Sequence, residues 1–184
     1  MTISTERLYE RVLVLRCQTG DEAAFTELVE RYHVRLRYYV RKVLGCDHRI
    51  DDVLQEIWLD VFRGVARLAD ASAFPAWIYR IARARVARLL RQPYPSVRPL
   101  EEADLVATAE DGREFTAEDA EIVHAALDRL SPEHREVLVL RFLEDMSYED
   151  IARVTGEQLG TVRSRLHYAK RALRGILERK SLHD

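Results

Sequence analysis

Residues that interrupt or cross-link a chain are scarce in this sequence. Glycine occurs seven times and proline five times in 184 residues, while apolar residues make up 47%, which is typical of a mostly helical globular protein. The two cysteines, Cys17 and Cys46, have no CxxC spacing, so neither a disulfide framework nor a cysteine-rich zinc site has support. Asp47 and His48 lie beside Cys46, but three neighbours without a distant cluster of ligands rarely hold a metal. We therefore expect no metal and no other cofactor.

Long apolar runs and catalytic motifs are missing as well. No apolar run approaches the roughly 20 residues that cross a bilayer, and residues 1–7 lack the basic-then-apolar layout of a signal peptide. We expect a cytoplasmic protein without membrane insertion. The sequence also offers no paired carboxylates, no nucleophile with its base and no phosphate-binding glycine loop, so an enzyme is not expected.

Charge is nearly balanced overall, yet it is segregated along the chain. The net charge is −2, but two segments are strongly basic, and nucleic-acid binding depends on such local stripes more than on the total. The first segment lies within 75–92, has no acidic residue and contains Arg80, Arg83, Arg85, Arg88 and Arg91. The second is opposed only by Glu178 and contains Arg163, Arg165, Lys170, Arg171, Arg174, Arg179 and Lys180.

The stretch between the two basic segments has the composition of a linker. It combines prolines with weak periodicity and with the acidic residues Glu101, Glu102, Asp104, Glu110, Asp111, Glu114 and Glu118. Such a mixture favours an irregular connector. We therefore predict an all-α protein with two small helical domains, residues 1–92 and 119–184, joined by a flexible acidic linker at 93–118.

Two amphipathic helices are predicted early in the N-terminal domain. Asp21 can cap the first, whose apolar residues recur at three- and four-residue steps and are Phe25, Leu28, Tyr32, Leu36, Tyr39 and Val43. After Gly45 a second helix buries Ile50, Leu54, Ile57 and Val61. Its opposite face carries Asp52, Gln55, Glu56, Leu59 and Arg63. A solvated surface is the default interpretation of such a face, although Leu59 among polar groups indicates docking.

A third helix is predicted from Pro75, after a loop at 64–73. Its apolar stripe consists of Ile78, Ala82, Val86 and Leu89. On the far side lie Arg80, Arg83 and Arg91, which suit contact with phosphate. Trp77 and Tyr79 stand at its beginning, where they either form a platform for an unstacked base or pack in the core.

The C-terminal domain carries the most specific pattern. Ser131 and Pro132 suit the first turn of an apolar helix, which we expect to bury Val137, Leu138, Leu140 and Phe142. Ser147, with Asp150 at the capping-box distance, starts a second helix that Gly156 ends. A third helix over 160–178 buries Val162, Leu166, Ala169, Leu173, Ile176 and Leu177.

The outer side of this last helix is polar and basic. Ser164, His167, Arg171 and Arg174 lie on it, flanked by Arg163, Lys170 and Tyr168. Two helices joined by a glycine-bearing turn, the second with a basic face, form a helix-turn-helix whose second helix enters the major groove. Its arginines could contact phosphates or guanine edges, because both contacts use the same guanidinium group.

Two separate parts of the chain resemble the extracytoplasmic-function (ECF) family of sigma factors. Region four of that family is similar to residues 130–142 (LSPEHREVLVLRF), 146–152 (MSYEDIA) and 160–166 (GTVRSRL). Region two is similar to residues 51–58 (DDVLQEIW) and 76–83 (AWIYRIAR). The order and separation also fit, and only the first twenty residues and the linker have no counterpart in this resemblance.

The resemblance implies a sigma factor that binds core RNA polymerase and directs initiation at promoter DNA. Region four would read the −35 element through Thr161, Arg163, Ser164, Arg165, His167, Tyr168, Lys170, Arg171 and Arg174. Region two would recognise and open the −10 element through Arg67, Trp77, Tyr79, Arg80, Arg83 and Arg91, with the loop at 65–73 capturing a flipped base. That loop is rich in alanine, so its specificity would depend on backbone groups.

The resemblance also implies protein partners. One face of the second helix would dock on the clamp helices of the largest polymerase subunit, and its residues are Asp51, Asp52, Gln55, Glu56 and Leu59. With this resemblance we interpret that face as an interface and not as a solvated surface. The C-terminal domain would meet the flap of the second-largest subunit. An anti-sigma factor is a further partner of this class of protein.

The chain departs from the family pattern at several positions. Many relatives have asparagine and aspartate at the positions of Ala84 and Arg88. Arginine is common at the position of Pro75, and a basic residue is frequent at that of Tyr168. Because these side chains would contact promoter DNA, we expect an atypical promoter preference. A helix-turn-helix regulator that works without polymerase would explain the C-terminal domain but not the face at 51–58.

Sequence leaves open how the two domains are packed in the free protein. Open and closed arrangements both fit the pattern. Like charge disfavours packing the two basic faces together, so an inhibitory partner or the acidic linker is the alternative cover for them.

Overall fold

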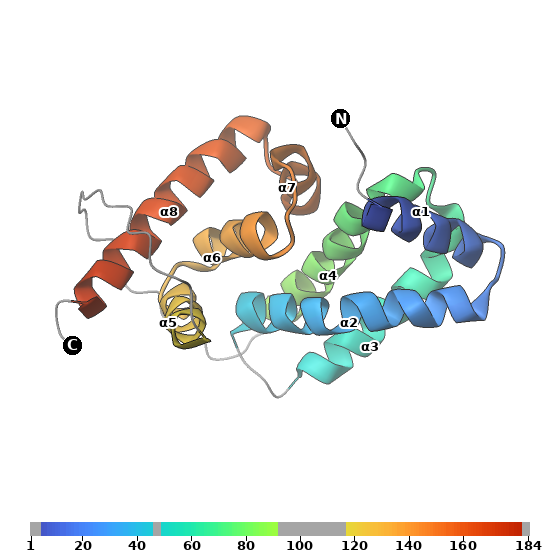
Figure 1. Cartoon of the computed structure of the whole chain (residues 1–184), viewed down its shortest axis with the longest axis horizontal. Helices are drawn as coiled ribbons and strands as arrows, with labels where there is room; N and C mark the ends of the chain where they lie inside the picture. Colours follow the sequence, from blue (N-terminus) through green and yellow to red (C-terminus); the bar gives the residue numbers. More distant parts are fainter. Residues whose placement is uncertain (1–4, 46–48, 92–116, 182–184) are drawn as a thin grey trace.

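A computed structural model describes residues 5–45, 49–91 and 117–181 of the protein (Figure 1). Helices, and no strands, make up the regular elements of these ranges, which confirms the predicted all-α fold. In chain order they are α1 (Thr5–Gln18), α2 (Glu22–Leu44), α3 (Ile50–Gly64), η1 (Val65–Arg67), η2 (Ala71–Ala73), α4 (Phe74–Leu90), α5 (Ala117–Asp128), α6 (Pro132–Leu138), η3 (Val139–Leu143), α7 (Tyr148–Thr155) and α8 (Leu159–Ser181). None of the helices in these ranges combines the length and hydropathy of a membrane span.

In the N-terminal unit, α1–α4, the helices α2, α3 and α4 are the predicted amphipathic helices. Asp21 caps α2 by accepting a hydrogen bond from the backbone N–H of Ala24 at 3.0 Å, and Gly45 ends it with a φ of 72°. The inward faces are buried as predicted, with Leu28, Tyr32, Leu36, Tyr39, Ile50, Leu54, Ile57, Val61, Ile78, Ala82 and Val86 in the core and Phe25 and Val43 at its edge.

Helix α1 is an element that the sequence pattern did not predict. It buries Leu13, Val14 and Cys17 against the rest of the unit and packs on α2. Its other side exposes Leu8, Val12 and Leu15, so apolar residues occur all around the helix and no single stripe stands out. Cys46, Asp47 and His48, the weak metal alternative, lie outside the described residues.

In the C-terminal unit, α5–α8, the helices α6 and α7 begin at the predicted serine caps. Ser131 accepts a hydrogen bond from the N–H of His134 at 3.3 Å at the start of α6. Ser147 does the same for Asp150 at 3.0 Å at the start of α7. Most of the predicted linker lies outside the described ranges, and α5 begins at Ala117, within the last two residues of that prediction.

One expectation for the C-terminal core is wrong. The apolar helix ends at Leu138, and a single π-helical turn, η3, follows it. The N–H of Glu144 bonds to the carbonyl of Val139 at 3.2 Å, five residues earlier. The wider turn changes the directions in which the side chains after Leu138 point. Leu140 therefore stays buried, whereas Phe142 is 59% exposed.

The two units lie against each other in a closed arrangement. Helix α7 packs on α4, and α6 packs on α2 (Figure 1). Glu136, which is 5% exposed, accepts hydrogen bonds from the hydroxyl of Tyr39 at 2.7 Å and from Nε of Arg83 at 3.0 Å. Glu144 pairs with Arg35 at 2.7 Å. The basic groups of α2 and α4 thus meet carboxylates, so like charge does not oppose this packing.

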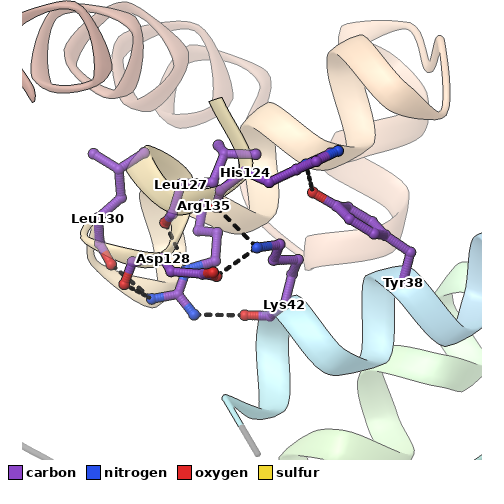
Figure 2. A network of polar contacts seen from close by, with 7 residues as sticks. All are labelled: Tyr38, Lys42, His124, Leu127, Asp128, Leu130 and Arg135. Atoms are coloured by element: carbon purple, nitrogen blue, oxygen red, sulfur yellow. Dashed lines mark hydrogen bonds and ion pairs between the residues drawn. The ribbon is translucent and has the colours of Figure 1, made fainter. Parts of the chain in front are cut away.

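A second polar network joins the end of α2 to α5 and α6 (Figure 2). Nζ of Lys42, 3% exposed, lies 2.6 Å from a carboxylate oxygen of Asp128 and 3.0 Å from the carbonyl oxygen of His124. Arg135 donates to the carbonyl of Lys42 at 2.7 Å and to those of Leu127, Asp128 and Leu130. It thereby satisfies carbonyls near the ends of two helices, where helical partners run out.

Candidate nucleic-acid interface

Helices α7 and α8 form the predicted helix-turn-helix. Gly156 ends α7 with a φ of 73°, a left-handed conformation that glycine adopts without a steric penalty. Val162, Leu166 and Ala169 are buried, and α8 packs through this side on α6 and α7. The opposite side of α8 is exposed to solvent.

Most of the predicted −35 residues share this outer face of α8. Seven of them are exposed and one, Thr161, is half-buried; the seven are Arg163, Ser164, His167, Tyr168, Lys170, Arg171 and Arg174. The rings of His167 and Tyr168 lie edge to face with centroids 5.5 Å apart. The face therefore combines cations, a hydroxyl and an exposed aromatic pair over about three helical turns.

Arg165 differs from the other predicted residues of α8. Its side chain is half-buried and its Nη2 lies 3.2 Å from Oε1 of Glu157. Glu157 stands in the turn before α8, so the pair ties the turn to the helix. An Arg165 held in this way is better placed to support the motif than to reach a base.

The predicted −10 residues are dispersed over the loop at 65–73 and α4. Arg67, Arg80 and Arg91 are exposed, whereas Arg83 is half-buried in its ion pair with Glu136. In the closed arrangement Arg83 therefore already has an anionic partner, and the C-terminal unit lies over this part of α4.

The two aromatic candidates of α4 have different positions. Trp77 is half-buried beside Phe74, with ring centroids 5.9 Å apart, and a Cβ on Gly64 would come within 2.9 Å of its ring. Tyr79 is completely buried, with its ring 5.1 Å from that of Tyr39, and burial raises the pKa of its hydroxyl well above the ordinary value. The expectation that Tyr79 contacts DNA is therefore corrected, because the ring belongs to the core.

The loop at 65–73 is more regular than the sequence pattern indicated. It contains two 3-10 turns, η1 and η2, which are joined by residues 68–70. Asp70 accepts hydrogen bonds from the backbone N–H of Ser72 at 2.8 Å and from its hydroxyl at 2.7 Å, and these bonds lower the pKa of the Asp70 carboxyl. Ala66, Arg67, Ala69, Asp70 and Ser72 are exposed, so the outer surface of the loop is accessible.

The predicted polymerase-docking residues share one face of α3. Asp51, Asp52, Gln55, Glu56 and Leu59 are all exposed. Arg37 pairs with Asp51, and Arg85 lies 2.7 Å from Glu56. Sequence reasoning missed Phe62, which is 61% exposed and follows Leu59 by one helical step of three. The i, i+3 spacing of two apolar residues on a polar face was the signal for it.

No group of three or more potential metal ligands comes together within the described ranges.

Comparison with known proteins assigns both units to sigma-70 regions. Residues 28–93 match the family Sigma-70 region 2, and residues 120–173 match Sigma-70, region 4. The ECF RNA polymerase sigma factor SigE of Mycolicibacterium smegmatis is 33% identical over 176 residues, which cover 89% of this chain and 66% of that protein. The ECF RNA polymerase sigma-E factor of Escherichia coli strain K12 is 31% identical over 181 residues, which cover 92% of this chain and 94% of that protein.

Two solved structures share the fold. CnrH, in complex with the cytosolic domain of CnrY, superposes with a TM-score of 0.66 at 24% identity, covering 92% of this chain and 97% of that one. The sigma factor RpoE from Bartonella quintana, in complex with the anti-sigma factor NepR, gives a TM-score of 0.65 at 20% identity, covering 84% and 96%. Because both sigma-70 regions match in order and the Escherichia coli relative aligns over nearly its whole length, the chain belongs to the ECF family of RNA polymerase sigma factors, which direct promoter-specific initiation of transcription.

Proposed function

We propose that this sigma factor divides promoter recognition between its two units, in the cytoplasm and without catalysis of its own. The C-terminal unit reads the −35 element with α8. The N-terminal unit recognises the −10 element and helps to open it. The exposed cationic face of α8 is the observation that carries this proposal, because a helix of this kind behind a glycine turn enters the major groove.

On α8 the residues have two kinds of role. Arg163, Lys170, Arg171 and Arg174 supply the charge that holds the phosphate backbone, which positions the helix without reading sequence. Ser164, His167 and Tyr168 lie among them and offer hydrogen bonds and apolar edges to bases. An aromatic at position 168 in place of a basic residue favours an apolar contact such as a thymine methyl group.

On the N-terminal unit the loop at 65–73 captures a base that leaves the stack. An extruded base needs a pocket and a stacking partner, and the half-buried Trp77 lies beside the loop. Arg67, Arg80 and Arg91 are exposed cations that contact the separated strand. Tyr79 has no part in this step.

The outer face of α3 docks on the clamp helices of the largest polymerase subunit. Its exposed acids flank an apolar pair, Leu59 and Phe62, and a small apolar centre with a polar rim is the usual anatomy of a protein interface. The C-terminal unit contacts the flap of the second-largest subunit.

Promoter binding through both units requires the closed arrangement to open. Arg83 is held by Glu136, and the two DNA elements lie apart on the duplex, so the contacts of α7 with α4 have to be exchanged for contacts with polymerase and DNA. An anti-sigma factor would act on this equilibrium, as a partner that stabilises one of the two arrangements.

Run-off transcription with core polymerase tests the proposal. A library of promoter fragments is transcribed with and without the protein, and start sites are mapped. We expect start sites that share two spaced upstream elements. Arg171→Ala should lower −35 binding about tenfold, since one arginine contact of this kind contributes about 1–3 kcal/mol. Arg129→Ala, an exposed arginine outside the α8 face, is the matched control.

Two outcomes would contradict it. Equal losses with Arg171→Ala and Arg129→Ala would show a general charge effect and no role for the α8 face. DNA binding without any stimulation of core polymerase would point to a regulator that works alone.

A further inference from the structure

Helix α1 lies outside both matched regions, yet it touches the loop at 65–73. The region matches begin at residue 28 and at residue 120, whereas α1 ends at Gln18. In space α1 packs on η1 and η2, the two turns that form the loop. An element with no assigned part in recognition thus lies directly under the segment that is proposed to hold a base.

The contact is made by one side-chain amide. Nε2 of Gln18 donates to the carbonyl oxygen of Val65 at 3.1 Å and to that of Leu68 at 2.7 Å. An amide NH₂ has two hydrogens, so both of them are used on this loop. The two carbonyls belong to the first residue of η1 and to the residue that follows it, and the N–H of Leu68 closes the same turn on Val65 at 3.1 Å.

The position of Gln18 is set by the turn between α1 and α2. Cys17 beside it is buried, and Gly20 takes a φ of 87°, so the chain reverses within three residues. The carbonyl of Arg16 accepts hydrogen bonds from the N–H groups of Thr19 and Asp21, and the side chains of Arg16 and Asp21 pair at 2.8 Å. Gln18 therefore projects from a closely bonded turn, which keeps its amide at one place.

The exposed surface of the loop offers few side-chain groups on η1 itself. Its exposed residues include two alanines, Ala66 and Ala69, which have no polar side-chain atoms. A base held there would be recognised mainly by backbone groups of the loop. The conformation of η1 determines where these groups point. The bonds from Gln18 hold the carbonyls of Val65 and Leu68 and thereby the shape of η1, which directs the exposed backbone groups of the loop.

We propose that Gln18 is a positioning residue that sets the shape of the base-capturing loop, and thereby the selectivity for the flipped base of the −10 element. This inference rests on the proposed function of the loop. Gln18 does not touch the base. Its effect passes through the carbonyls of Val65 and Leu68.

A set of variants at this position separates hydrogen bonding from packing. Gln18→Met keeps the length and the apolar stem but removes both donors. Gln18→Glu keeps the shape and turns an acceptor toward two carbonyls. Gln18→Lys restores donors at similar reach. Thr19→Ala is the matched control, because Thr19 is the next residue and its hydroxyl donates to the carbonyl of Arg16 at 2.8 Å without contacting the loop.

Each variant is assembled with core polymerase, and its affinity for single-stranded oligonucleotides of the non-template −10 element is measured, with each base replaced in turn. We expect discrimination at one base position to fall about 3- to 10-fold with Gln18→Met, the loss of about one to two hydrogen bonds. Gln18→Glu should lose more, and Gln18→Lys and Thr19→Ala should stay within about twofold of the parent protein. Amide exchange of residues 65–69 should accelerate in Gln18→Met and Gln18→Glu only, while affinity for a −35 duplex should not change.

The outcomes distinguish this inference from the function on which it rests. Asp70→Ala, which loosens the loop from its other end, serves as the reference. If Asp70→Ala alters base discrimination and Gln18→Met does not, Gln18 has no positioning role, although the loop still captures a base. If neither variant alters it, the loop is not the capturing element, and both statements are overturned. Equal effects of Gln18→Met and Gln18→Lys would show that packing, and not hydrogen bonding, is what the loop needs.

Discussion

The packing inside the N-terminal unit and the contact between the two units differ in how many buried charged groups they contain. Within the N-terminal unit, fully buried aliphatic and aromatic side chains from four helices interlock. Between the units, carboxylates of the C-terminal side meet guanidinium, ammonium and hydroxyl groups of α2 and α4. Apolar packing continues across the contact, since buried apolar side chains of both units belong to one core cluster, but the ion pairs of the contact can be replaced by contacts with water, salt or phosphate. The comparison indicates that the ion pairs are the exchangeable part of the contact between the two units.

We expect the largest effect from removing an apolar side chain from the core of the N-terminal unit. Leu36→Ala removes a fully buried side chain of α2 and should lower the free energy of unfolding by about 2–5 kcal/mol. Urea unfolding followed by circular dichroism measures it. Val34→Ala, two residues away and 73% exposed, is the control. A loss below that of Val34→Ala would mean that the core of this unit does not determine its stability.

An intermediate effect is expected from weakening the contact between the units. Glu136→Gln keeps the shape but removes the charge that Arg83 and Tyr39 share. It should favour the open arrangement by about 1–2 kcal/mol, seen as a larger radius of gyration in small-angle X-ray scattering, with little change in helix content. Glu133→Gln, exposed on the same helix, is the control. The prediction is contradicted if Glu136→Gln lowers the unfolding midpoint but leaves the radius of gyration unchanged. The ion pair of Glu136 with Arg83 would then stabilise the fold and not the closed arrangement.

An ion pair inside one unit but at its surface should matter less. Arg37 and Asp51 join α2 to α3 with side chains 47% and 80% exposed. Because solvent and salt screen such pairs, Arg37→Ala should change the free energy of unfolding by about 0–1 kcal/mol. The same urea titration measures it, at low and at high salt. A change as large as that of Leu36→Ala would contradict the view that apolar packing dominates within the units.

The smallest effect concerns pH and the network of Figure 2. Desolvation, and then the charges of Lys42 and Arg41, lower the pKa of His124, against a smaller opposite effect of Asp128. A lowered pKa means that the closed arrangement prefers the neutral imidazole. Closing should therefore weaken as the pH falls below the ordinary histidine pKa of about 6.5. His124→Gln should remove this dependence from the radius of gyration between about pH 8 and pH 5.5.

The pH experiment has a clear opposite result. The hydroxyl of Tyr38 lies 2.6 Å from Nδ1 of His124, and burial raises its pKa to about 12, so Tyr38 stays neutral throughout the titration. A closed arrangement that tightens as the pH falls would show that the imidazolium is stabilised at this contact, by Asp128 for example. The pKa of His124 would then be raised and not lowered in the closed arrangement, which would contradict the prediction.

Residues near each other in sequence allowed correct predictions. Asp21, Ser131 and Ser147 cap the helices that they were predicted to cap, and Gly156 takes the left-handed conformation. The buried faces of α2, α3 and α8 also follow the three- and four-residue spacing of apolar side chains. Caps and amphipathic faces depend on neighbours within one or two helical turns, which the sequence displays directly.

Other positions could not be predicted, because they depend on partners far along the chain. The π turn η3 moved Phe142 outward, and nothing in the local pattern of apolar residues marks such a turn. Tyr79 has the same spacing from its neighbours whether it faces DNA or the core. Its burial follows from how α4 packs against α2, next to Tyr39.

The sequence by itself determined the helices of the two matched regions, their caps, the helix-turn-helix and the ECF sigma family, since all of these follow from local spacing and motifs; it did not determine α1 or the turns η1, η2 and η3. Only the tertiary structure decided which basic groups already have anionic partners. Glu136 lies 53 positions from Arg83, and Glu144 lies 109 positions from Arg35. It also brought the amide of Gln18 under a loop about 50 residues away. Such pairings arise when folded units pack, because surface charge and shape at distant sites have to match, and no local pattern records that match.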